Sequence, residues 1–253
     1  MRAYELIKET FLRRTFIWIA HLSWLALYGL FWWLFLPEAE EFGSFIFIFS
    51  GFFLPLALSA GIFGDDIASG RICILITKPF WSGQLYIYRF LGLSLQGAVH
   101  CLLTGVLAFA LHAFMRKGSI EGLGMWLLAS WLLFNTCAAL STSLSVVVAR
   151  SFNSLLLLVV IVIGSFVARL LMGALTAEAA TGALTSFIRY ACPPFELLRK
   201  FAGGEYDKFS LTVGRFSVTK SVACIVHCLM LTTVYGIAGI VILCRREFSR
   251  VRD

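Results

Sequence analysis

The sequence predicts an all-α membrane protein with six transmembrane helices. Hydrophobic residues make up 60% of the 253-residue chain, charged residues only 14%, and the mean hydropathy is +0.89. A water-soluble domain of this length needs far more surface charge, so most side chains here must face something other than water. The apolar residues also come in long uninterrupted runs, which is typical of helices surrounded by lipid.

Apolar runs of about 20 residues, the length that crosses a bilayer, mark the predicted spans. In chain order they are Thr15 to Leu36, Phe45 to Phe63, Phe90 to Phe114, Leu123 to Val148, Ser154 to Gly173 and Ser221 to Cys244. Aromatic residues crowd several of their ends, as expected where helices meet the membrane–water interface. No small-residue cleavage site follows the first run, so we expect it to be a span and not a cleavable signal peptide.

Lysine and arginine gather in the segments that flank the spans on one side. Arg2, Lys8, Arg13 and Arg14 precede the first span, and four arginines follow the sixth. The loop 37–44 on the other side carries three glutamates and no basic residue. Because short cytoplasmic segments are enriched in basic residues, we expect both termini in the cytoplasm. The basic residues behind the net charge of +7 thus cluster at the ends of apolar runs, as in membrane proteins. The sequence shows no basic stripe with interleaved aromatics that would indicate nucleic-acid binding.

Residues 1–14 are expected to form a helix at the cytoplasmic membrane surface. Charged residues alternate there with apolar ones, and Tyr4, Ile7 and Phe11 share one helical face. This pattern is typical of an amphipathic helix that lies in the interface.

Two longer connections complete the single predicted transmembrane domain. Residues 64–89 form a cytoplasmic connection that is too long for a tight turn. Residues 174–220 form an outward segment, expected to be partly helical, whose own apolar stretch is too short and too charged to span. No internal sequence repeat is visible, so the inverted-repeat architecture of many secondary transporters gains no support.

The sequence contains no residue grouping typical of an enzyme. It has no G-x-x-x-x-G-K-[ST] phosphate loop, no H-E-x-x-H and no G-x-S-x-G. The seven cysteines include no C-x-x-C pair, so neither a disulfide framework nor a zinc site is indicated. Cys224 and Cys228 are interpreted as small packing residues on one helical face. We therefore expect a non-enzymatic protein with no cofactor of its own.

Ionisable residues inside membrane spans are candidates for function. No Asp or Glu lies inside a span, which disfavours a proton-driven carrier. Arg169, near the outer end of the fifth span, is interpreted as structural, with contact to an anionic substrate as the alternative. His21, His100, His112 and His227 fall within or near spans. A His100–His227 pair could bind haem between two helices, but a neutral histidine that forms a hydrogen bond between helices is favoured.

The most distinctive stretch runs from Asp65 to Arg89. It begins with an acidic pair, and Gly70 then permits a bend. The apolar run from Ile72 to Ile76 follows and is ended by Pro79, because a proline cannot continue the helical hydrogen bonding. A short apolar helix on the cytoplasmic face, without a lipid partner, suits docking into a groove on another protein.

This stretch resembles the type-2 ABC transporter permease family. Members carry an acidic residue after the second span, a glycine four residues later, an aliphatic run, a proline nine after the glycine and a basic residue ten after the proline. The matching positions are Asp66, Gly70, Leu75, Pro79 and Arg89. Many members have arginine three residues after the proline, where this chain has Ser82. The resemblance extends to the six-span layout and to a proline–aromatic turn before the last span, here Pro193-Pro194-Phe195.

The resemblance implies the permease subunit of an ATP-driven exporter in the bacterial cytoplasmic (inner) membrane. Two permease chains, as a homodimer or a related pair, would each present residues 64–89 to one of two separate ATPase subunits, which bind ATP and Mg. Residues 72–79 would dock on the ATPase, and Asp65 and Asp66 would anchor the end of the second span against Arg71 or a basic residue of the N-terminal helix. The implied coupling residues are Asp65, Asp66, Gly70, Ile72, Ile74, Leu75, Pro79 and Arg89, and weaker candidates for a substrate pathway are Arg169, His100 and His227.

The implied cargo remains open among a lipid-linked glycan, a drug-like amphiphile, a peptide, and an ion or sulfur species. By length and layout the chain is similar to permeases of multicopper-enzyme maturation and of drug efflux, with polysaccharide exporters as a further possibility. Two functions of other classes are the alternatives: a haem-binding membrane redox protein and a non-transporting membrane scaffold.

Overall fold

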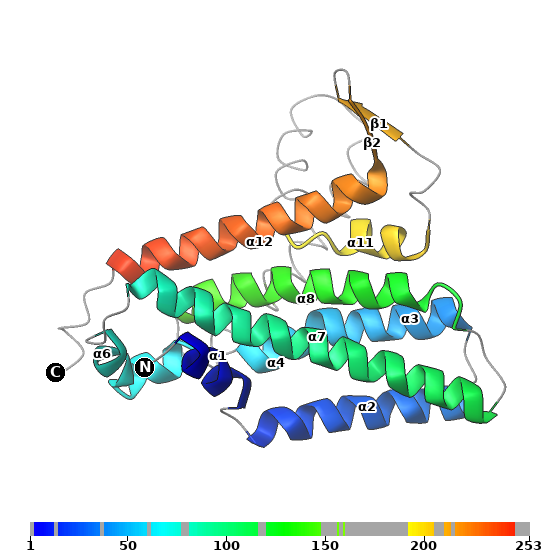
Figure 1. Cartoon of the computed structure of the whole chain (residues 1–253), viewed down its shortest axis with the longest axis horizontal. Coiled ribbons are helices and arrows are strands. Elements are labelled where there is room, and N and C mark those ends of the chain that lie inside the picture. The colour runs from blue at the N-terminus through cyan, green and yellow to red at the C-terminus, as the bar shows by residue number, and fades with distance from the viewer. Residues whose placement is uncertain are drawn as a thin grey trace.

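The structure is a computed structural model that describes most of the chain and places long helices side by side (Figure 1). The described residues are 3–12, 15–35, 38–59, 62–76, 81–115, 120–147, 156, 159, 192–204, 210–213 and 216–245. They are almost entirely helical, with one short β-hairpin. The predicted fifth span, Ser154 to Gly173, and with it Arg169, lies outside the described residues except for two isolated positions.

Among the described residues, four helical stretches are long and apolar enough to cross a membrane, which supports the prediction of a helical membrane protein. They are Glu40–Ala68, Ser82–Met115, Leu123–Ser145 and Ser221–Arg245. Helix α2, Thr15–Phe35, contributes a shorter apolar helix, His21–Phe35, at the position of the predicted first span.

The second predicted span is a helix interrupted by one wide turn. Helix α3 (Ala39–Ile48) runs into a π-helical turn, η1 (Phe49–Phe53), and then into α4 (Leu54–Ser59). Pro55 explains the wide turn, because a proline ring collides with the carbonyl four residues earlier in a regular α-helix. A π-turn just before the proline relieves that collision and changes the direction of the side chains within it.

The third predicted span begins earlier than expected. Two short helices, α5 (Gly64–Ala68) and α6 (Arg71–Ile76), follow the second span, and α7 then runs from Ser82 to Met115. Its 34 residues correspond to a length of about 51 Å at 1.5 Å per residue. Because the hydrocarbon core of a bilayer is only about 30 Å thick, α7 must extend well beyond it.

Helix α8 (Leu123–Ser145) is the central helix of the bundle and contacts α3, η1, α4, α7, α11 and α12. Several of its buried hydroxyls bond back to carbonyls of the preceding turn, as in Ser130 to Trp126 and Thr136 to Leu132. These polar side chains are therefore satisfied without water. Close contact with α7 requires a glycine there, since a Cβ on Gly97 would lie 2.6 Å from the Phe134 ring.

The described part of residues 174–220, the segment predicted to face outward, contains a helix and a hairpin. Helix α11 (Phe195–Ala202) buries Leu198 and Phe201 in the bundle core, and the Phe195 ring lies 4.9 Å from that of Phe47. Strands β1 (Ser210–Val213) and β2 (Phe216–Thr219) pair antiparallel and lead directly into α12 (Lys220–Arg245). The helix agrees with the predicted partly helical segment, whereas the hairpin was not predicted.

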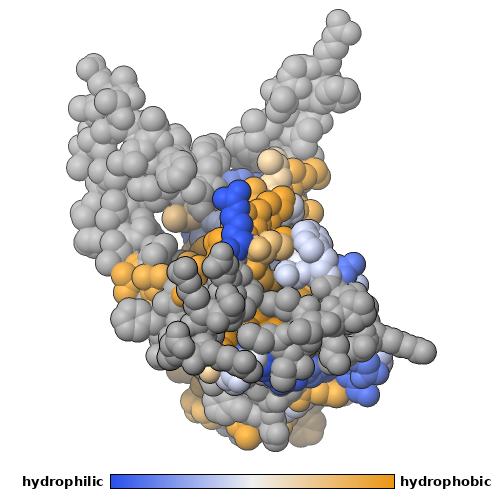
Figure 2. Space-filling view, turned by 90° about the vertical axis from the view of Figure 1, so that its left-hand side faces the viewer, coloured by the Kyte–Doolittle hydropathy of each residue, from blue (hydrophilic) through white to orange (hydrophobic). Residues whose placement is uncertain are grey.

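A second apolar cluster lies at the opposite end of the bundle, where α1 (Ala3–Leu12) and α6 are found (Figure 1). It joins side chains of α1, α4, α5, α6, α7, α8 and α12. Seen from this end, hydrophilic side chains reach the surface next to hydrophobic ones (Figure 2). This end contains the described part of the 64–89 connection.

Candidate functional site

A buried ion pair joins the 64–89 connection to the long helix α7. The Arg89 Nη2 atom donates to the Asp66 Oδ2 atom at 3.0 Å, and neither side chain is exposed to solvent. Arg89 also donates from Nη1 to the Thr10 hydroxyl at 3.1 Å. One guanidinium therefore holds α5, α7 and the N-terminal helix α1 together.

Glu9 of α1 lies between two arginines. Its Oε1 atom accepts from Arg71 Nη2 at the start of α6, and it is 3.6 Å from Arg89 Nη2. For the acidic pair Asp65 and Asp66, the sequence predicted a contact with Arg71 or with a basic residue of the N-terminal helix. In the structure Asp66 pairs with Arg89, and Arg71 pairs with Glu9 of α1.

The contact between α1 and α7 is close because α7 has a glycine at the crossing. A Cβ on Gly92 would lie 2.7 Å from the Thr10 side chain and 3.1 Å from the Ile7 carbonyl. Gln96, one turn further along, donates from Nε2 to the carbonyls of Thr10 and Phe11 at 3.3 and 2.9 Å. These carbonyls belong to the last turn of α1, where no intrahelical donor is available. Gln96 therefore caps the helix.

The face of α1 that packs against the bundle is centred on Leu6 and Thr10, whereas Tyr4, Ile7 and Phe11 were predicted to share the face toward the membrane. Leu6 and Thr10 are buried and Ile7 and Phe11 half-buried, whereas Tyr4 is 66% exposed. Polar partners on α7, Arg89 and Gln96, explain why Thr10 lies in this contact. The sequence pattern of apolar residues could not indicate it.

The bend between α5 and α6 lies at Gly70, whose φ of +69° is in the left-handed region that favours glycine. The Ser69 hydroxyl donates to the Asp65 carbonyl at 2.7 Å and closes the end of α5. Beyond the bend, Ile72 and Leu75 are buried in the chain's own core, 0% and 7% exposed. The side chain of Ile74 and all of Pro79 lie outside the described residues.

Sequence reasoning missed the contribution of α1, namely Glu9 and Thr10, and that of Gln96. Gln96 was detectable in principle, since an amide inside an apolar helix needs a buried partner. The partners could not be identified from spacing, because they are distant along the chain. Gln96 is 85 and 86 residues from Phe11 and Thr10, and Arg89 is 79 and 23 residues from Thr10 and Asp66.

His100, in the third predicted span, forms hydrogen bonds between helices. His100 Nδ1 lies 3.0 Å from His21 Nδ1 of α2, and His100 Nε2 lies 3.1 Å from the Ser50 hydroxyl of η1. The structure thus brings His100 to His21 rather than to His227, which lies on α12. In the part of the chain that the structure describes, no three His, Cys, Asp or Glu side chains are grouped so as to hold a metal ion.

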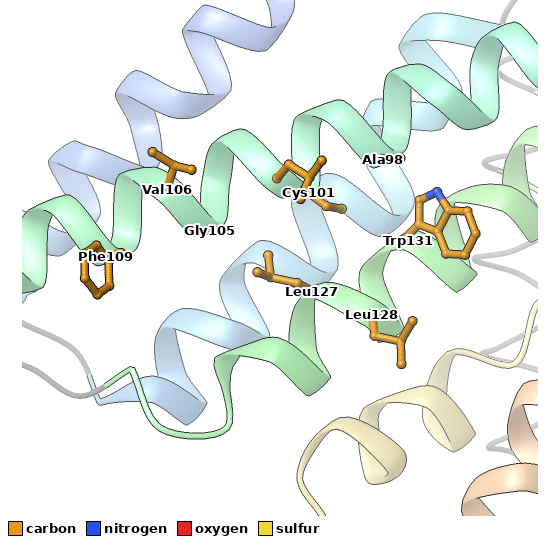
Figure 3. Close-up of a pocket in the computed structure, with 9 residues that line it drawn as sticks. Ala98, Cys101, Gly105, Val106, Phe109, Leu127, Leu128 and Trp131 are labelled. Carbon is orange, nitrogen blue, oxygen red and sulfur yellow. The ribbon is translucent and has the colours of Figure 1, made fainter.

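An apolar hollow of about 640 Å³ lies between α7 and α8 (Figure 3). Of its lining side chains, Trp131 donates its indole N–H to the Ser94 carbonyl at 3.3 Å. The lining contains neither His100 nor His227; it consists of Ala98, Cys101, Leu102, Gly105, Val106, Phe109, Leu127, Leu128 and Trp131.

No family model matches this chain, and no curated protein is significantly similar to it. The resemblance to ABC permeases therefore rests on residues 65–89 and on the predicted topology.

Proposed function

We propose that the chain is the membrane-spanning permease subunit of an ATP-driven exporter of the inner membrane. In this proposal six spans cross the bilayer, both termini are cytoplasmic, and two permease chains act with two ATPase subunits. The observation that carries the proposal is the buried Asp66–Arg89 pair, because both residues belong to the pattern by which the sequence resembles the family.

A coupling segment must be firmly attached to a span if it is to move that span. Asp66 ties α5 to the second turn of α7, and the Glu9–Arg71 pair ties α6 to α1. Ile72 and Leu75 add apolar contacts to the same core. A displacement of α5 and α6 by an ATPase would therefore displace α1 and α7 with them, as a rigid body.

The burial of Ile72 and Leu75 changes the expected docking surface. Side chains packed in the chain's own core are not available to a partner, so the ATPase would contact the outer side of the bend. Ala68 and Ser69 are exposed there, and the Arg71 side chain is 40% exposed. We accordingly assign docking to the bend around Gly70, and to Ile72 and Leu75 the attachment of the segment to the spans.

The haem alternative gains no support from the histidine geometry. Both ring nitrogens of His100 are within hydrogen-bonding distance of Ser50 and His21, so neither points to an unoccupied space between helices. A Soret band in the purified protein, lost on substitution of His100, would nevertheless decide for that function.

Gly70 and Gly122 allow a matched test of the permease proposal. Both have positive φ, +69° and +76°, and a Cβ on either would meet nothing within 4 Å. The left-handed conformation should therefore destabilise each alanine variant by a similar amount, about 1–2 kcal/mol. Only Gly70 lies at the proposed docking bend.

The measurement is the ATPase activity of each candidate ABC-type ATPase subunit of the source genome, with the chain reconstituted in lipid nanodiscs. We expect the wild-type chain and Gly122→Ala to stimulate ATP hydrolysis equally, and Gly70→Ala to reduce that stimulation by at least fivefold. Equal stimulation by both variants would reject the docking bend. A result in which none of these ATPases binds or responds to the wild-type chain would reject the permease function.

A further inference from the structure

Helix α2 is attached to the rest of the bundle through a chain of four polar side chains in an apolar surrounding. Tyr28 Oη lies 2.5 Å from Ser50 Oγ, Ser50 Oγ lies 3.1 Å from His100 Nε2, and His100 Nδ1 lies 3.0 Å from His21 Nδ1. All four are at most 3% exposed. This series of hydrogen-bonded side chains begins and ends on α2 and passes through η1 and α7.

Hydrogen counting restricts how the four side chains Tyr28, Ser50, His100 and His21 can be protonated. Two imidazole nitrogens at 3.0 Å share one proton, so one ring donates and the other accepts. If His100 Nδ1 donates to His21, then His100 Nε2 accepts from Ser50, and Ser50 accepts from Tyr28. Every group is satisfied in this arrangement. When both rings are protonated, both Nδ1 atoms are donors and the contact cannot form.

The π-turn places Ser50 in the chain. Ser50 lies in η1, whose wider turn changes the direction of its side chains relative to α3. From there its hydroxyl reaches both Tyr28 of α2 and His100 of α7. The irregularity in the second span thus completes the polar attachment of the first.

Within the described ranges, no carboxylate is placed to compensate a doubly protonated pair. The titratable groups near the two histidines are Tyr28 on α2 and Cys101 on α7. The neighbouring residue of η1 is Ser50, which is uncharged. From α1, the Phe11 ring contacts the Trp18 ring, which in turn contacts His21. Among the described residues, no Asp, Glu, Lys or Arg acts electrostatically on either imidazole. Two protons on these rings would therefore repel each other without a neighbouring anion.

We infer that His21 and His100 form a proton-operated latch that holds α2 against the bundle. The docked state excludes the doubly protonated pair, whereas separated histidines in contact with water titrate near their ordinary pKa of about 6.5. The undocked state thus binds more protons, so docking is stable above this pH and is weakened as the pH falls below it. Between pH 8 and pH 5, the exclusion of this second proton shifts the equilibrium toward undocking by about 30-fold in total.

The distance between α2 and α7 tests this inference directly. Spin labels at Leu22 and Leu102, which are 65% and 69% exposed, would report it in the otherwise cysteine-free full chain in nanodiscs. We expect one narrow distance distribution at pH 8 and a second, longer population at pH 5. In His21→Gln/His100→Gln, whose amides do not titrate in this range, the pH 8 and pH 5 distributions should coincide.

Thr136→Val is the matched control, because it removes another hydrogen bond between helices, that of Thr136 with Thr232 at 3.3 Å. This variant should keep the wild-type pH response. Tyr28→Phe, which removes only the hydroxyl at the far end of the chain, should raise the pH at which the second population appears, and it provides a test if the double variant does not fold. Wild-type distributions that are identical at pH 8 and pH 5, or a pH response that persists in the glutamine variant, would overturn the latch.

Discussion

Arg89 is among the largest side chains that the described part of the protein buries completely. Removing a guanidinium from water is costly, and the cost is repaid only if its hydrogen bonds are made with good geometry. Asp66 and Thr10 satisfy two of its nitrogens, at 3.0 and 3.1 Å. The pair therefore specifies how α1, α5 and α7 fit together more than it adds net stability.

Breaking this pair from one side should be severe, because a buried charge is then left without its partner. We expect Asp66→Asn to lower the free energy of unfolding by about 3–5 kcal/mol, measured by denaturant titration in mixed micelles. The double variant Asp66→Leu/Arg89→Met should recover most of that loss. The control is Glu196→Gln, which breaks the exposed pair with Lys200 and should cost at most about 1 kcal/mol. A double variant as unstable as Asp66→Asn would contradict this account.

The sequence identified Asp66 and Arg89 individually but not as partners. Family spacing pointed to both positions, but the partner expected for Asp66 was Arg71 or a basic residue of the N-terminal helix. In a folded chain the partner of a buried charge is decided by which helices cross. That information is not contained in the spacing of charged residues along the chain.

At the scale of elements, prediction succeeded where apolar runs are bounded by turns. The expected spans Leu123 to Val148 and Ser221 to Cys244 agree closely with α8 and α12. It failed at the start of α7, because residues 82–89 are too polar to be counted as membrane-spanning although they continue the same helix. The hairpin was missed because its two strands have only four residues each.

Glycines at helix crossings should resist substitution in proportion to the space around them. A Cβ on Gly97 would lie 2.6 Å from the buried Phe134 ring, whereas one on Gly29 of α2 would meet nothing within 4 Å. We expect Gly97→Ala to destabilise the protein by about 1–3 kcal/mol through overpacking. Gly29→Ala should be neutral or stabilising by up to about 1 kcal/mol, since alanine favours helix. The thermal unfolding midpoint in detergent measures both, and equal midpoints would refute the close crossing.

At the scale of the whole molecule, composition alone predicted a helical membrane protein, and the four long apolar helices support it. Whether the number of spans is six depends on two further segments, α2 and residues 154–173. For both segments the prediction of a span was made from length and hydropathy. Orientation depends on charge asymmetry, which acts during insertion and leaves no trace in internal contacts.

Labelling of single cysteines tests the proposed orientation. Cys244 lies exposed at the end of α12, and Glu121 lies exposed in the turn before α8. We expect a membrane-impermeant maleimide to label a variant with only Cys244 from the cytoplasmic side, and a variant with only Glu121→Cys from the opposite side. Cys192 is unsuitable as a reporter because burial raises the pKa of its thiol and slows alkylation. Labelling of both positions from one side would refute the proposed topology.

The crossing of α7 with α8 at Gly97 has a mechanical consequence. Gly97 lies 15 residues from Ser82 and 18 from Met115, that is, about 22 Å and about 27 Å along the helix axis. The Phe134 contact can therefore act as a fulcrum between two lever arms of nearly equal length. A tilt imposed at the end near Arg89 would reach the far end of α7 with similar amplitude and in the opposite direction.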